Sequence, residues 1–269
     1  MRIPKGLPAA RLLPLCMVFV ACAVHAEGGL LLVDAPPLDQ AHLSYGGAAF
    51  AYPSYPGSAS LSVLPIPAFE WTHPSGIFVS TDIGVGWNLS PWRNVQFGAR
   101  LWPDLARRSS DGARLRGLRD IPLRVERTLF ANWEPVPFAQ LQSSLRTGLG
   151  PDARGTMLEL GASIGAPVTS TVLLGLTAGV SRANTAWRQA FFGILPDQTQ
   201  ASGLPVFYAG AGWQDFQTAV GGEWQITHDW RLDVRLENWR LLGAAAASPL
   251  TESRWQHGLV LNLWHDLNP

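Results

Sequence analysis

One stretch of the sequence has the spacing of a nucleophilic active site. Gly161-Ala162-Ser163-Ile164-Gly165 matches the G-x-S-x-G pattern, in which a strained turn between a strand and a helix exposes a serine hydroxyl. Here the flanking residues alternate between apolar and polar, so the motif lies within an expected strand and no helix follows it. We therefore expect Ser163 to pack in the wall of a sheet, with no catalytic role.

The other residue types that carry chemistry are scarce or isolated. Both cysteines and the only lysine, Cys16, Cys22 and Lys5, lie near the N-terminus, so the chain after residue 26 has no thiol or lysine nucleophile. The histidines after residue 26 have neither the spacing of a metal site nor a partner in a recognisable catalytic motif. They are His42, His73, His228, His257 and His265. The sequence therefore predicts a protein that is not an enzyme and holds no cofactor or metal.

The N-terminus has the pattern of a secretory signal peptide. Three basic residues accompany an apolar run over residues 12–24, and small residues around Ala26 suit cleavage. The run is shorter than the roughly 20 residues that a membrane-spanning helix needs. A lipoprotein signal ending at Cys22 is the alternative. We expect residues 1–26 to be removed, which leaves a slightly acidic exported domain, residues 27–269, that is not suited to nucleic acid.

Alternation between apolar and polar residues is the main structural signal. In residues 230–237 four apolar side chains alternate with four charged ones, and residues 121–133 repeat the pattern. Each such segment has one apolar face and one polar face, as a strand between two different environments requires. Seven further segments alternate in this way, over residues 77–89, 95–101, 139–146, 158–164, 172–181, 216–226 and 259–264, and two more, residues 41–52 and 61–71, do so less regularly.

A transmembrane barrel explains these eleven segments better than a soluble β-sandwich or lipocalin-like barrel, which are the alternatives. The charged rows need water, which the lumen of a membrane barrel supplies. Tryptophans recur near the segment ends, as at membrane interfaces: Trp71, Trp87, Trp92, Trp102, Trp133, Trp224, Trp230, Trp239, Trp255 and Trp264. Because bacterial barrels have an even number of strands, we expect an all-β, antiparallel up-and-down barrel of about 12 strands, with Gly29–Asp34 as the twelfth and ten strands as the alternative. The long connections, residues 103–120, 183–213 and 243–254, then share one side.

Two groups of charged residues are candidates for function. The first lies on the polar faces and would line the lumen, where it either sets an ion preference or neutralises itself across strands: Arg124, Glu126, Arg231, Asp233, Arg235 and Glu237. The second is an arginine-rich loop, whose guanidinium groups suit lipopolysaccharide phosphates or a protein partner: Arg107, Arg108, Arg114, Arg116 and Arg119. An ordinary solvated loop is the alternative for this second group.

Four blocks of sequence stand out, in order from about residue 45 to the C-terminus. They are Tyr55-Pro56-Gly57-Ser58 with Leu64-Pro65-Ile66-Pro67, then Gly117-Leu118-Arg119-Asp120-Ile121, then Phe192-Gly193-Ile194 through Ser202-Gly203-Leu204-Pro205 and Ala209-Gly210-Ala211-Gly212, and last Arg240-Leu241-Leu242-Gly243 with Ser248-Pro249. Together they resemble the MipA/OmpV family of outer-membrane proteins.

The resemblance implies a location in the bacterial outer membrane, in contact with its lipid and lipopolysaccharide. It also implies a noncatalytic scaffold or anchor for a murein lytic transglycosylase and a peptidoglycan synthase, docked on the periplasmic turns. A small-solute channel, or a surface adhesion or stress-response barrel, is the alternative function. The chain departs from the family at its end, because it continues past Trp264 for five residues where members usually stop at an aromatic residue.

Overall fold

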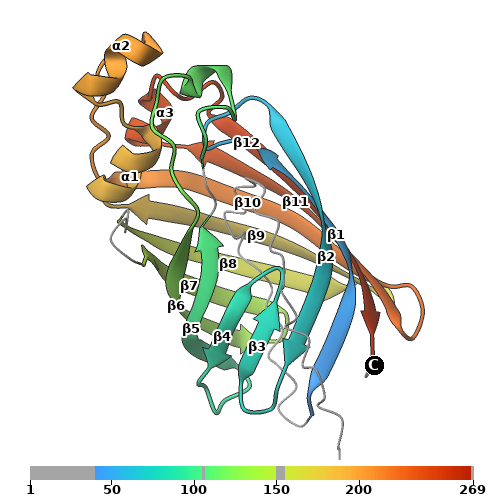
Figure 1. Cartoon of the computed structure of the whole chain (residues 1–269). Helices are drawn as coiled ribbons and strands as arrows, with labels where there is room; N and C mark the ends of the chain where they lie inside the picture. Colours follow the sequence, from blue (N-terminus) through green and yellow to red (C-terminus); the bar gives the residue numbers. More distant parts are fainter. Residues whose placement is uncertain (1–39, 105–106, 150–154, 268–269) are drawn as a thin grey trace, which may run out of the picture.

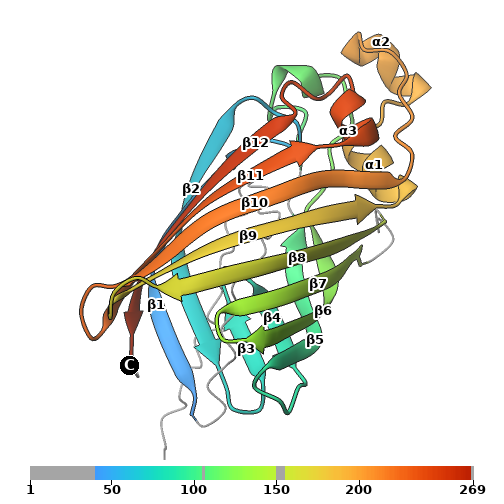
Figure 2. The ribbon, with the colours of Figure 1, turned by 180° about the vertical axis from the view of Figure 1, so that it is seen from behind.

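The protein is a closed barrel of antiparallel strands in which each strand pairs with its neighbours along the chain (Figures 1 and 2). The computed structural model describes residues 40–104, 107–149 and 155–267. Within them lie twelve strands: β1 (His42–Pro53), β2 (Leu61–Thr72), β3 (Ile77–Ser80), β4 (Gly84–Asn88), β5 (Val95–Asp104), β6 (Arg124–Val136), β7 (Ala139–Gly148), β8 (Thr156–Pro167), β9 (Val172–Ala183), β10 (Gly212–Gln225), β11 (Trp230–Leu241) and β12 (Trp255–Asp266). The expected all-β barrel of twelve strands is confirmed. The expected signal peptide lies outside the described residues.

The alternating residues of the sequence face alternately outward and into the lumen. One row of outward residues crosses six neighbouring strands in register: Val63, Ala51, Leu259, Leu236, Val220 and Leu176. The side chain environment differs sharply between the faces, since Leu236 is 53% exposed and its neighbour Glu237 is 2% exposed. An apolar outer band around a polar interior is the arrangement of a transmembrane barrel.

The twelfth strand is not where the sequence placed it. The expected strand over residues 77–89 is a hairpin of two short strands, β3 and β4, joined by a turn at residues 81–83. Gly84 ends the turn with φ +90°, a backbone conformation that glycine adopts readily. Because the turn has three residues, odd-numbered positions face outward in both strands and the alternation continues through it. The proposed strand Gly29–Asp34, which lies outside the described residues, is not needed for the count.

The two ends of the barrel differ. At one end, called the turn rim here, short turns join the strands at residues 73–76, 89–94, 137–138, 168–171 and 226–229. At the other end, the loop rim, the connections are long, and they carry η1 (Ala113–Leu115), α1 (Thr185–Phe192), η2 (Pro196–Gln198), α2 (Thr199–Ser202) and α3 (Gly243–Ala247). The long connections therefore share one side, as predicted.

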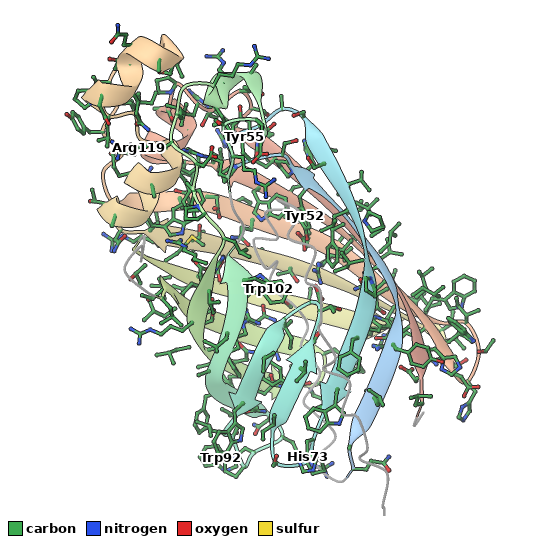
Figure 3. The ribbon with its side chains drawn as sticks, in the orientation of Figure 1. Tyr52, Tyr55, His73, Trp92, Trp102 and Arg119 are labelled. Atoms are coloured by element: carbon green, nitrogen blue, oxygen red, sulfur yellow. The ribbon has the colours of Figure 1, made fainter. Side chains whose placement is uncertain are left out.

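The long loops pack together over the mouth of the barrel at the loop rim. Tyr55, Leu115, Ile194 and Leu250 come from four different connections around the barrel, and they form one buried apolar cluster. A second cluster, centred on Trp187, joins α1 to α3 and to the ends of β8, β9 and β11. We call these packed loops, residues 54–60, 107–123, 184–211 and 242–254, the cap (Figures 1 and 3).

In the part of the chain that the structure describes, no helix is both long enough and apolar enough to cross a membrane.

The tryptophans divide into two groups, which corrects the expectation that all of them sit at the membrane interfaces. Trp87, Trp92 and Trp224 are exposed on the outside of the barrel. Trp239 and Trp264 instead point into the lumen and are nearly fully buried. The alternation explains this, because each of the two lies on the inward face of its strand together with polar residues: Trp239 follows Glu237 on β11, and Trp264 follows Asn262 on β12.

Candidate functional site in the lumen

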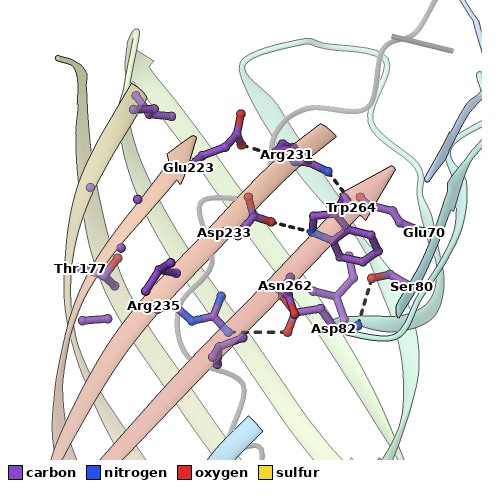
Figure 4. Close-up of a pocket in the computed structure, with 18 residues that line it drawn as sticks. Glu70, Ser80, Asp82, Thr177, Glu223, Arg231, Asp233, Arg235, Asn262 and Trp264 are labelled. Carbon is purple, nitrogen blue, oxygen red and sulfur yellow. Dashed lines mark hydrogen bonds and ion pairs between the residues drawn. The ribbon is translucent and has the colours of Figure 1, made fainter. Parts of the chain in front are cut away.

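The half of the lumen nearer the turn rim contains a charged pocket (Figure 4). Its empty volume is about 1110 Å³, counting the solvent to which it opens. The polar side chains come from β2, the β3–β4 hairpin, β9, β10, β11 and β12, so they face one another across the barrel. The charged members are Glu70, Asp82, Glu223, Arg231, Asp233 and Arg235.

Arg231 lies among three carboxylates. Its guanidinium nitrogens are 3.4 Å from Glu223, 3.8 Å from Glu70 and 3.9 Å from Asp266. Asp233 lies beside it on β11 and accepts a hydrogen bond of 2.7 Å from the indole nitrogen of Trp264. This corner of the lumen therefore holds four carboxylates around one arginine, three of them in the pocket, and it suits cations better than anions.

A second arginine ties the short hairpin to the opposite wall. Arg235 of β11 is 3.6 Å from Asp82, which lies in the turn between β3 and β4. It also forms an ion pair with Glu237, whose other oxygen accepts a hydrogen bond of 3.1 Å from Tyr52. The tip of the hairpin thus reaches into the lumen and is held there by charge.

The half of the lumen nearer the loop rim has its own ion network. Glu126 pairs with Arg124 at 3.3 Å and with Arg146 at 2.9 Å, and Arg146 continues to Glu159 at 3.2 Å. The side chain of Glu126 is only 1% exposed. The guanidinium of Arg124 also lies 5.9 Å from the ring centre of Phe191, which connects this network to the cap.

The six residues proposed from the sequence to line the lumen all face inward, but the structure divides them between two networks. Arg124 and Glu126 lie near the loop rim, whereas the four residues of β11 run down towards the turn rim. Sequence reasoning missed five charged partners of these residues, which are Arg146, Glu70, Glu223, Asp266 and Asp82, and it missed Glu159, which pairs with Arg146. The alternation within one strand shows which residues face inward, but it does not give the register with the next strand.

The arginines of the loop after β5 have different surroundings. Arg107 is 3% exposed and donates a hydrogen bond of 2.7 Å to the carbonyl of Phe191, so it holds the cap together and is not available to a lipid. Arg119 forms an ion pair with Asp197 on the surface of the cap. Arg108, Arg114 and Arg116 are exposed. Contact between the exposed arginines and lipopolysaccharide stays a prediction.

Two groups of the cap have shifted pKa values. The pKa of Asp120 is held below its usual value, chiefly because its carboxylate accepts a backbone hydrogen bond of 2.6 Å from Ser109. Burial raises the pKa of the Tyr55 hydroxyl, and the nearby Glu252 raises it further. Both groups hold loops of the cap in place.

Ser163 lies in the middle of β8, as the alternation predicted. It is 1% exposed, and its hydroxyl lies 2.8 Å from that of Thr177 on β9. The geometry is that of a wall residue, because the motif adopts extended strand backbone and no turn exposes the hydroxyl. Among the described residues, no group of three or more His, Cys, Asp or Glu side chains is placed to hold a metal ion.

Comparison with known proteins identifies the family. The family model described as MltA-interacting protein MipA matches residues 45–264, which is most of the barrel. The chain belongs to this family. A search of curated proteins found no match.

The solved structures that the chain resembles include three membrane barrels at low identity. The NanC porin is 7% identical, with coverage of 84% of this chain and 100% of that chain and a TM-score of 0.42. The CymD monoaromatic hydrocarbon channel is 10% identical, with coverage of 84% and 88% and a TM-score of 0.40. The translocator domain of the autotransporter NalP from Neisseria meningitidis is 11% identical, with coverage of 84% and 88% and a TM-score of 0.38.

The blocks that resemble the MipA family lie close together in space. Tyr55, Leu118, Ile194 and Leu204 come from three of the four blocks and pack in one cluster of the cap. Leu241, from the fourth block, packs in the neighbouring cluster. The blocks that carry the resemblance in the sequence therefore lie mainly in the loops that cover the loop rim.

Proposed function

We propose that this protein is a noncatalytic anchor in the bacterial outer membrane that holds a murein lytic transglycosylase, together with a peptidoglycan synthase, at the turn rim. The family description, an MltA-interacting protein, supports such a partner. In this proposal the loop rim faces outward and the turn rim faces the periplasm, which is the usual orientation of barrels with short turns and long loops.

The cap is the observation that favours an anchor over a channel. Loops from around the barrel meet in one apolar cluster over the mouth, and the ions below it are paired with one another. A channel for solutes needs an open mouth and charges that are free to meet the solute. An anchor needs neither, and it keeps the turn rim free for a partner.

Phe138 is the turn-rim residue that we assign to the docking surface. It lies in the two-residue turn between β6 and β7, is 47% exposed, and has φ +64°. A bulky residue in the left-handed region is a genuine outlier, and such strain is often kept at functional positions. The turn itself needs no phenylalanine, because glycine or asparagine adopts this conformation more easily.

The test is to replace Phe138 with glycine and to measure both stability and binding. We expect Phe138→Gly to raise the stability of the barrel by about 1 kcal/mol, because the strain is relieved. We also expect weaker co-purification of the murein lytic transglycosylase from gently solubilised membranes. The matched control is Tyr208→Ala, which removes an aromatic residue that is 69% exposed on the cap.

Three results would contradict the proposal. If the Phe138→Gly variant captured as much transglycosylase as the unchanged protein, Phe138 would not be part of the docking surface. Equal loss in the Tyr208→Ala variant would place the partner at the other rim. Current steps from the purified barrel in planar bilayers would instead favour the channel.

A further inference from the structure

In the part of the chain that the structure describes, the wall of the barrel is interrupted between β2 and β5, where only the short β3–β4 hairpin lies. A strand that crosses a membrane needs roughly 9–11 residues, whereas β3 has 4 and β4 has 5. The hairpin pairs with β2 only at Glu70–Thr72 and with β5 only at Gly98–Leu101. Towards the loop rim, residues 61–68 of β2 have a strand partner on one side only, among the residues that the structure describes. Figure 1 shows the hairpin ending well short of the loop rim.

The backbone on both sides of this interruption is adapted to have no strand partner. Phe69 exchanges hydrogen bonds with Thr81 of the hairpin, so odd-numbered residues of β2 point their backbone groups away from β1. Pro65 and Pro67 are at such positions. On β5, Phe97 accepts from Leu89, so odd-numbered residues there face β4, and Pro103 is one of them. Each of the three prolines therefore lacks an N–H group at a position where no strand of the described residues would accept it.

This placement favours hydrocarbon over another strand as the neighbour. An unpaired N–H in hydrocarbon costs several kcal/mol, and proline removes that cost at positions 65, 67 and 103 while it also blocks strand addition there. The outer surface here is apolar, because Val63 is 69% exposed and lies in register with Leu259 and Leu236 of the outer band.

The inner surface on the β2 side of the interruption is also apolar, unlike the β5 side, where Arg100 faces the lumen. Leu64 and Ile66 of β2 face inward and are half-buried, and they pack against Phe50 of β1 and Val260 of β12. The opposite wall presents Glu126, Arg146 and other polar groups. Apolar surface therefore continues from the outside of β2, past its unpaired edge, to the inside.

We propose that the stretch between β2 and β5 admits an alkyl chain from the membrane, which lies against Leu64 and Ile66 inside the barrel, above the buried side chains of Phe50 and Val260. The chemistry recognised is a linear hydrocarbon tail, of either a membrane phospholipid or a free fatty acid. The truncated hairpin makes the entrance, and the ion pair between Asp82 and Arg235 holds its tip in the lumen below the tail.

Photolabelling of the full protein in lipid nanodiscs tests the proposal. In one arm the bilayer contains phosphatidylcholine with a diazirine on an acyl chain, and in the other it contains diazirine-bearing palmitic acid. Outward residues such as Leu129 should be labelled by the bilayer in the first arm. We expect label on the inward residues Leu64 and Ile66 as well, and none on inward residues of β6–β8. The arm that gives this label identifies the source of the tail.

The matched pair of variants is Ile66→Asp and Leu173→Asp. Both place a carboxylate on an inward apolar position, but Leu173 is on β9, across the barrel from β2. We expect Ile66→Asp to reduce inward labelling roughly tenfold, which corresponds to about 1.4 kcal/mol, and Leu173→Asp to leave it unchanged. Heat-dependent mobility on SDS gels checks that both barrels are closed.

Three results would overturn the inference. The first is label confined to outward residues in both arms. The second is a dimer cross-linked through β2, which would make the neighbour a strand. The third is inward label that arises only after deletion of residues 27–39, which would make this segment of the chain the native occupant.

Discussion

Glu126 is the residue whose loss should most affect the stability of the barrel. Its side chain is 1% exposed, and its partners Arg124 and Arg146 are 4% and 10% exposed. Breaking a buried ion pair by removing one partner costs about 3–5 kcal/mol. Because the pocket in the other half of the lumen opens to solvent, we expect the lower end of this range for Glu126→Gln. A loss of about 3 kcal/mol reduces the folding equilibrium constant by roughly a hundredfold.

The assay is urea unfolding of the barrel in lipid vesicles, followed by tryptophan fluorescence. The control is Glu223→Gln, which removes a carboxylate that is 35% exposed and 3.4 Å from Arg231. An ion pair with this exposure contributes about 0–1 kcal/mol after solvent screening. Equal losses for the two variants would refute the argument that burial, and not the presence of an ion pair, decides the effect.

Three further perturbations have defined outcomes. Gly84→Ala should destabilise the barrel by about 1–3 kcal/mol, because φ is +90° and a Cβ would lie 2.3 Å from a β5 carbonyl, whereas Gly47→Ala has open space and should be neutral in the same urea assay. Tyr52→Phe should cost about 1.5–3 kcal/mol, since it removes a buried hydrogen bond to the Glu237 carboxylate. The depressed pKa of Asp120 means that its stabilisation is present above the usual value of about 3.9 and is lost as the pH falls through the folded value. Amide resonances of the β5–β6 loop should therefore shift below about pH 4 in NMR spectra.

The fold could be predicted where each strand separates lipid from a polar lumen. β11 is the clearest case, because every inward residue from Arg231 to Glu237 is charged. β1 and β2 were harder to delimit, and the structure gives the reason: their inward faces carry Phe50, Leu64 and Ile66, so both faces are largely apolar. The β3–β4 hairpin was missed because its turn preserves the alternation.

The candidate site could be predicted only one strand at a time. Alternation placed Glu126 on the inward face, but the link from Arg146 to Glu159 depends on the register between β7 and β8, which a single strand does not reveal. The cap could not be predicted from the sequence, since it depends on contacts such as that between Tyr55 and Leu250, which are 195 residues apart. Arg107 is an example. The sequence predicts an exposed side chain, because Arg107 lies in a polar loop, whereas the cap buries it.

The pairing of β12 with β1 has a consequence for how the molecule is made. Ser44 donates a hydrogen bond of 2.5 Å to Asp266 across this seam, and 222 residues separate the two positions. Contacts so distant in sequence form late, because the chain between them must be ordered first. The cylinder therefore cannot shut before almost the entire polypeptide has been delivered, and a chain that lost its last strand would leave two unsatisfied edges in the bilayer. Such a truncation should be cleared by proteolysis, even though it retains the whole of the cap.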